Sequence, residues 1–228
     1  MNQNDLLINE LFDLSHTIAT ELFVSKQYPW EVLSDIHSFI ITVGNQLSPE
    51  EYELHGTDIW IAKDAVVAES ASLTGPLIID HEATIRHCAF IRGDVIVGKK
   101  CVVGNSTELK NCILFDRVQV PHYNYVGDSV LGYRSHMGAG SIASNLKTDQ
   151  QPVIIRGDDQ GIPFTIPTNR KKVGAILGDS VEVGCGCVLN PGTVIGKGSH
   201  IYPLSSIRGA VPAASIYKAP DTIIPIHS

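Results

Sequence analysis

The sequence has little of what marks membrane, disulfide-bonded or nucleic-acid-binding proteins. No stretch approaches 18 consecutive apolar residues, and the opening MNQNDLL lacks the charged-then-apolar pattern of a secretory signal. The five cysteines are odd in number and contain no C-x-x-C pair, so packing is favoured over metal or redox work. The 17 basic residues against 24 acidic ones give a net charge of −7, which argues against nucleic acid and anionic membranes as partners. We therefore expect a cytoplasmic protein without a metal site.

The strongest feature present is a six-residue repeat between residues 59 and 121. Every sixth position is apolar ten times in succession, and with 43% apolar residues this arises by chance with a probability of roughly 2 in 10,000. The repeat positions are Ile61, Val67, Leu73, Ile79, Ile85, Ile91, Val97, Val103, Leu109 and Phe115, followed by Pro121. Helices and half-buried strands have other periods, so the repeat predicts short strands joined by corners in a parallel β-helix.

The repeat is interrupted twice. It slips after Pro121, resumes at Leu131, and returns after a long interruption at Leu177. Residues 145–172, rich in proline, glycine and charge, are too long for a coil corner. They predict an excursion from the β-helix, and such loops on rigid scaffolds tend to be functional.

These patterns divide the chain into a helical cap (1–56), a β-helix (57–211) of about seven coils with an insertion at 145–172, and a tail (212–228). In the cap, leucine and isoleucine at three- and four-residue spacing predict one amphipathic helix over 4–25. Pro29 suits the first turn of a second helix ending at Gly44. We expect this pair to cover the open end of the first coil.

The spacing of Arg92 and Lys110 suggests an anion site. Both follow an inward residue and they are 18 residues apart, so they should stack on one outer face about 4.8 Å apart. A bound phosphate would relieve the repulsion between the two cations. The alternative is an ordinary surface network, in which nearby carboxylates such as Glu108 screen the pair.

His122 is the candidate general base. Histidine is the side chain best suited to take a proton from an amine or hydroxyl near neutral pH. A lone histidine on a surface is more often only a surface residue, so this assignment depends on the sequence around it.

That surrounding sequence resembles one family. The matching stretches are PHYNYVGD (121–128), HMGAGS (136–141), SNLK (144–147), RKKVGAILGD (170–179) and LNPG (189–192). They are similar to the C-terminal half of the bifunctional sugar-1-phosphate nucleotidyltransferase/acetyltransferases, the archaeal-type members above all. The resemblance covers about residues 57–220. It implies an all-β fold, a left-handed parallel β-helix with three hexads in each coil, and transfer of an acetyl group from acetyl-CoA to an amino sugar 1-phosphate.

The resemblance also implies roles for individual residues. It assigns His122 as the catalytic base and Asn145 as the residue that orients the acceptor. The sugar-phosphate contacts fall on Arg92, Lys110 and Tyr125, and the acetyl-CoA contacts on Ala139 and Lys218. The implied assembly is a homotrimer, in which a neighbouring β-helix closes the site.

Two other interpretations stay open. No glycine-rich G-x-G-T-like loop opens the chain, so the nucleotidyltransferase half is expected to be absent. The chain could then be a non-catalytic sugar-phosphate or nucleotide-sugar binding module that partners a separate nucleotidyltransferase. A γ-class carbonic-anhydrase-like enzyme, suggested by Arg92-Gly93-Asp94, would need three histidine ligands, and no His-x4-His pair is present.

Overall fold

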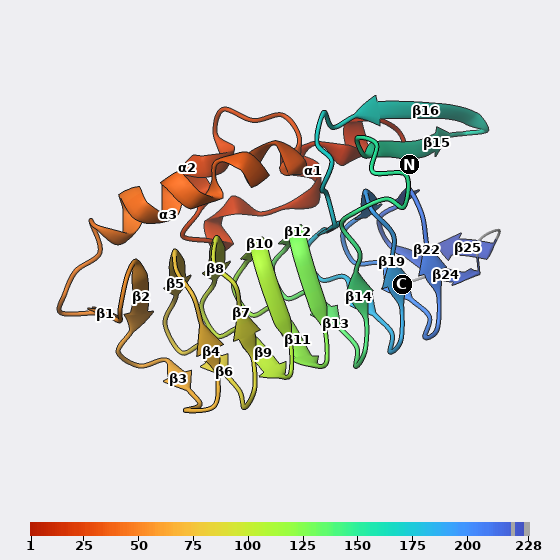
Figure 1. Ribbon diagram of the computed structural model, residues 1–228. Coiled ribbons are helices and arrows are strands. Elements are labelled where there is room, and N and C mark those ends of the chain that lie inside the picture. The colour runs from red at the N-terminus through yellow and green to blue at the C-terminus, as the bar shows by residue number, and fades with distance from the viewer. Residues whose placement is uncertain (220–221, 226–228) are drawn as a thin grey trace.

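The computed structural model describes residues 1–219 and 222–225, and most of them wind into a parallel β-helix (Figure 1). Strands of successive coils pair in parallel and form three flat faces. The cap face, named for the helices above it, begins with β2 (Ile59–Ala62), β5 (Leu77–Ile79) and β8 (Val95–Val97), continues through the second halves of β10 (Glu108–Leu114) and β12 (Tyr125–Leu131), and ends with β17 (Ala175–Leu177), β20 (Thr193–Ile195) and β23 (Ala210–Val211).

The other two faces follow the same stacking. The site face comprises β4 (Ser72–Leu73), β7 (Phe90–Ile91), the first halves of β10 and β12, β14 (Ile142–Ala143), β19 (Val188–Leu189) and β22 (Ser206–Ile207). The third face comprises β3 (Val66–Val67), β6 (Thr84–Ile85), β9 (Val102–Asn105), β11 (Gln119–His122), β13 (His136–Met137), β18 (Glu182–Val183), β21 (His200–Ile201) and β24 (Ser215–Ala219). The parallel β-helix predicted from the repeat is confirmed.

The six-residue register holds through Leu109 and then changes by one residue. Leu77 pairs with Val95, 18 residues on, but Val97 pairs with Leu114, only 17 residues on. The predicted inward positions Phe115 and Pro121 are therefore wrong, and Leu114 and Val120 take their places in the wall. The register thus slips after Leu109, earlier than the sequence suggested.

The cause of the slip is a shortened corner. Most corners contain one residue with positive φ three positions after the inward residue, as at Asp94 after Ile91. After Leu109 and Val126 that residue comes only two positions later, at Asn111 and Asp128. With one residue fewer to turn the corner, β10 and β12 run through it as continuous seven-residue strands.

The displaced Phe115 points outward and joins the cap to the β-helix. It is fully buried, and its ring lies 5.0 Å from the ring of Phe12 and 5.6 Å from that of Phe23. Outward residues of the cap face are buried as well, which explains the triple apolar runs of its strands; examples are Ile78, Ile96, Ile113 and Val130. Each such side chain contributes about 1.5–3 kcal/mol when it is fully removed from water.

The cap differs from the predicted helical pair. Residues 4–25 form four short turns in place of one helix, namely η1 (Asn4–Leu6), α1 (Ile8–Leu11), η2 (Leu14–His16) and α2 (Thr20–Phe23). The helix is interrupted because its backbone makes hydrogen bonds to coil corners. Asp179 N–H donates to Leu11 O at 3.0 Å, and Asp116 N–H donates to His16 O at 2.9 Å. The second segment is η3 (Pro29–Ser34) followed by α3 (Ile36–Gly44).

The position of the cap also differs from the expectation. Its helices lie along the cap face, with α3 against β5, β8 and β10, and do not cover the open end of the first coil (Figure 1). At that end, β1 (Tyr52–Leu54) pairs antiparallel with β2. No helix among the described residues is long and apolar enough to cross a membrane.

The predicted excursion is a β-hairpin, and the tail continues the β-helix. Strands β15 (Ile154–Asp159) and β16 (Ile162–Pro167) pair antiparallel and lie on the same side of the β-helix as the cap (Figure 1). Beyond the boundary expected at residue 211, β24 extends the third face, and β25 (Thr222–Pro225) pairs antiparallel with it. The remainder of the predicted tail, residues 220–221 and 226–228, lies outside the described residues.

Candidate functional site

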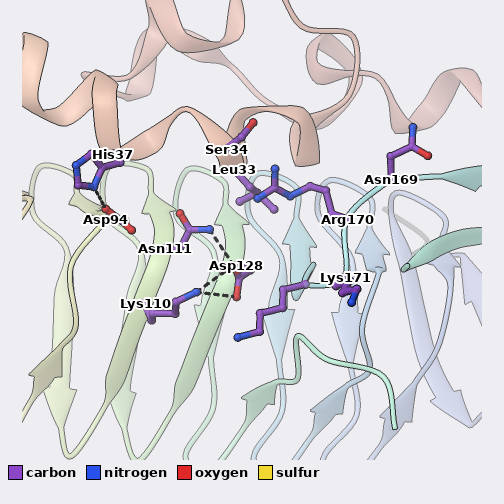
Figure 2. A pocket seen from close by; sticks show the side chains of 11 residues that line it. Leu33, Ser34, His37, Asp94, Lys110, Asn111, Asp128, Asn169, Arg170 and Lys171 are labelled. Carbon is purple, nitrogen blue, oxygen red and sulfur yellow. Dashed lines mark hydrogen bonds and ion pairs between the residues drawn. The ribbon is translucent and has the colours of Figure 1, made fainter. Parts of the chain in front are cut away.

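The shortened corners at Asn111 and Asp128 bring a buried carboxylate and its donors together. Asp128 is only 2% exposed. Its Oδ1 accepts a hydrogen bond from Asn111 Nδ2 at 2.8 Å, and Lys110 Nζ lies 3.4 Å from the same oxygen and 3.5 Å from Oδ2 (Figure 2). A buried carboxylate is stable only when such partners satisfy it, so Asp128 fixes the positions of both side chains.

Asn145 and Tyr125 complete this cluster. Asn145 Nδ2 donates to Asp128 Oδ2 at 2.5 Å and to the Tyr125 hydroxyl at 3.1 Å. Burial raises the pKa of the Tyr125 hydroxyl, and the negative charges of Asp128 and Glu108 raise it further. The phenol is therefore kept neutral beside the carboxylate. Three of the predicted site residues, Lys110, Tyr125 and Asn145, are brought together by Asp128, which the sequence did not single out.

Arg92 lies one coil below Lys110, as predicted, because Ile91 pairs with Leu109. Its Nη1 donates to Glu108 Oε1 at 2.7 Å, and this hydrogen bond raises the pKa of the guanidinium. Each of the two stacked cations thus has its own carboxylate. The pairing of Arg92 with Glu108 is one that the surface-network alternative names.

A cavity of about 460 Å³ opens beside Asp128, between the β-helix and the cap (Figure 2). Its walls carry four cationic side chains and two carboxylates. The lining residues are Leu33, Ser34, His37, Asp94, Lys110, Asn111, Asp128, Asn169, Arg170, Lys171 and Lys172. The excess of cations over carboxylates makes this cavity attractive to an anion.

Two features of this cavity were not foreseen. The cap contributes His37, whose Nδ1 lies 2.7 Å from Asp94 Oδ1, and no sequence pattern pointed to that contact. Arg170 has a buried Nε without a hydrogen-bond partner in the described part of the chain. The sequence does show the basic run Arg170-Lys171-Lys172 at the end of the excursion, but no pattern assigned this run to a site.

His122 lies at the opposite edge of the site face. His122 is exposed. Its backbone N–H donates to Asn124 Oδ1 at 3.1 Å, and its backbone carbonyl accepts from Gly140 N–H at 3.0 Å. Asn124 is 2% exposed and its Nδ2 donates to Gly138 O at 2.9 Å, so a buried side chain links the corner that carries His122 to the next coil. The structure describes no side-chain contact between His122 and the Asp128 cluster.

The two residues predicted to contact acetyl-CoA lie further along the same edge. Ala139 is in the corner one coil above His122, and its N–H makes no hydrogen bond within residues 1–219 and 222–225. Lys218 lies one coil above Tyr202, with Nζ 5.7 Å from the centre of that ring. This edge therefore offers a free backbone donor near His122 and a cation at its far end. No cluster of three or more potential metal ligands occurs among the described residues.

Comparison with known proteins gives both family and relatives. A protein family described as the GMPPB C-terminal domain matches residues 73–195. "Bifunctional protein GlmU" of Methanococcus maripaludis is 32% identical over an alignment 216 positions long, which covers 86% of this chain and 47% of the relative. The "Bifunctional sugar-1-phosphate nucleotidylyltransferase/acetyltransferase" of Sulfurisphaera tokodaii is 29% identical over 67% of this chain and 41% of its own length. The resemblance predicted from the motifs is confirmed.

Solved structures give weaker matches. The acetyltransferase domain of PglB from Neisseria gonorrhoeae, in complex with acetyl coenzyme A, aligns with a TM-score of 0.41 and 18% identity, over 74% of this chain and 58% of that one. An acetyltransferase from Bacillus cereus aligns with a TM-score of 0.43 and 17% identity, over 73% and 77%. The chain spans about half the length of the curated relatives it matches. Because the family match covers more than half of its residues, the chain belongs to the GMPPB C-terminal domain family.

Proposed function

We propose that this protein transfers an acetyl group from acetyl-CoA to the amine of an amino sugar 1-phosphate. The observation that carries the proposal is the cation-lined cavity beside Asp128, because it offers the phosphate of the acceptor four positive charges. The name of the Sulfurisphaera tokodaii relative, which includes acetyltransferase, supports the reaction type.

In the proposed reaction, His122 accepts a proton from the amine of the sugar as the nitrogen attacks the thioester carbonyl. The carbon–nitrogen bond forms, the carbon–sulfur bond breaks, and the proton leaves with the CoA thiol. The free N–H of Ala139 would hydrogen-bond the oxygen on which negative charge develops. Asn145 would orient the acceptor, and Lys110 would hold its phosphate together with the other cavity cations. Arg92, one coil below Lys110, would add a contact once it is released from Glu108.

Release of free thiol tests this reaction. The full chain should release CoA thiol when acetyl-CoA is mixed with glucosamine 1-phosphate. Glucosamine without the phosphate should react poorly, and N-acetylglucosamine 1-phosphate, which has no free amine, should release none. Because Cys88 and Cys185 are exposed, the same mixture without acceptor supplies the thiol background. Binding of glucosamine 1-phosphate without any thiol release would instead favour the non-catalytic binding module.

The proposal includes a homotrimer assembled through the site face. Three apolar side chains are exposed in one outward column of that face: Phe90 (43%), Ile142 (39%) and Val188 (36%). The cap face is already covered by the protein's own helices. A second chain on the site face would bury this column and close the site at its open side. All five cysteines are free, which supports a reducing compartment such as the cytoplasm.

Light scattering at micromolar concentration should therefore give the mass of three chains. Ile142→Asp should shift the mass toward one chain, because it places a charge in the contact. Val66→Asp is the matched control, since Val66 is 63% exposed but lies on the third face. A parent protein with the mass of one chain would contradict this assembly.

A further inference from the structure

A second group of cations lies on the β-helix away from the cavity of Figure 2. The corners that follow β8, β10 and β12 on the cap face place Lys100, Arg117 and Arg134 one above another, all with φ near +60°. Arg117 N–H donates to Lys99 O at 2.7 Å, and Arg134 N–H donates to Asp116 O at 3.1 Å. These corners are therefore stacked directly, at the edge between the cap face and the third face.

Two adjoining hollows occur at this edge. One, of about 310 Å³, is lined by Arg117, Gln119, Arg134, His136 and Glu182. The other, of about 250 Å³, is lined by His16, Lys99, Lys100, Asp116, Arg117 and Tyr133. Arg117 lines both, so the hollows adjoin at this residue, and we call the two together the arginine corner.

The charges of the arginine corner are only partly balanced. Lys100 pairs with Glu82 at 3.2 Å, and His136 with Glu182 at 2.9 Å. Neither Arg117 nor Arg134 has an ion-pair partner among the described residues.

The sequence predicted two stacked cations, available to an anion, at Arg92 and Lys110. There each cation is paired with a carboxylate, whereas no ion pair within residues 1–219 and 222–225 engages Arg117 or Arg134. Because the two guanidinium groups repel each other, a bound anion would stabilise this arrangement.

We propose that the arginine corner binds a metabolite carrying at least two linked phosphates. Arginines one coil apart, about 4.8 Å, allow each planar guanidinium to hold its own phosphate with two hydrogen bonds. The rings of His16 and Tyr133, stacked at 3.7 Å and 10°, form a flat wall beside the cations. This site is separate from the acetyl-transfer site and does not depend on the proposed function.

Calorimetric titration of the full chain with inorganic pyrophosphate tests the proposal. The double variant Arg117→Gln/Arg134→Gln should weaken pyrophosphate binding about tenfold or more, because it removes two charge-assisted contacts. Glutamine tolerates the left-handed corners no worse than arginine, and both positions are exposed, so the melting temperature without ligand should be unchanged. Orthophosphate should bind more weakly than pyrophosphate.

Two further variants separate this site from others. Arg86→Gln removes an exposed cation at a different edge and should leave pyrophosphate binding within about twofold of the parent. Lys110→Ala should weaken binding at the cavity of Figure 2 but leave a pyrophosphate site intact. The proposal is overturned if the double arginine variant binds pyrophosphate like the parent, or if Lys110→Ala alone abolishes binding.

Discussion

His122→Ala should lower acetyl transfer about 100- to 10,000-fold, the usual contribution of a positioned general base. Residual activity should rise with pH, because more of the amine is then deprotonated without help. The fold should survive, since His122 is exposed outside the inward column and a surface change costs within about 0.5 kcal/mol. Acceptor binding should persist, because Lys110 and the other cavity cations are unchanged. Thiol release across a pH series measures both effects.

The chain supplies a matched control for this variant. His87 lies two coils below His122 in the same column of corners, since Ile85 pairs with Val103 and His122 pairs with Asn105. It is also exposed. His87→Ala should leave acetyl transfer within about twofold of the parent. Full activity of His122→Ala would remove this residue from the mechanism, and an equal loss in both variants would point to a general effect on this edge.

The β-helix was predictable because the burial that stabilises each coil recurs at the same positions in the next. Each coil buries the same apolar column on the coil below, so the inward positions recur and the sequence displays the period directly. The one-residue slip was harder to see, because Leu114 and Phe115 are both apolar and either fits the repeat. The same ambiguity holds for Val120 and Pro121. Only the backbone of the shortened corners, at Asn111 and Asp128, decides which residue points inward.

The cap was mispredicted because tertiary contacts override local periodicity. The apolar spacing over residues 4–25 does mark a buried side, and Leu11 and Leu22 are buried as the pattern requires. The backbone, however, gains hydrogen bonds to β-helix corners that a continuous helix would exclude. Such bonds join residues a hundred or more positions apart, as between Leu11 and Asp179, so no local pattern predicts them.

The candidate site was predictable in part because the coils repeat. Coil arithmetic stacked Lys110 on Arg92, and the family resemblance added Tyr125 and Asn145. Neither the coil spacing nor the resemblance showed that Asp128 is buried, because an acidic residue after a glycine is typical of an ordinary exposed turn. His37 was also unpredictable, since its place in the cavity depends on how the cap packs on the β-helix.

Asp128→Asn is expected to disrupt the cluster that organises the cavity. Both carboxylate oxygens of Asp128 accept hydrogen bonds, Oδ1 from Asn111 and Lys110, and Oδ2 from Asn145 and Lys110. An asparagine amide has only one oxygen, so in either orientation its NH2 group faces another donor. Breaking such a buried arrangement costs about 2–4 kcal/mol, which corresponds to a fall in melting temperature of about 5–15 °C for a chain of this size.

The same substitution should also affect turnover, because Lys110 and Asn145 lose the partner that positions them. The KM for the sugar phosphate should rise about tenfold. Glu108→Gln is the matched control: only Oε1 of Glu108 is bonded, to Arg92, so the glutamine oxygen can keep that bond. The control should melt close to the parent temperature. If Asp128→Asn instead matches the parent in both melting temperature and KM, then Asp128 does not organise the cavity, and the positions of Lys110 and Asn145 must be fixed by the β-helix backbone alone.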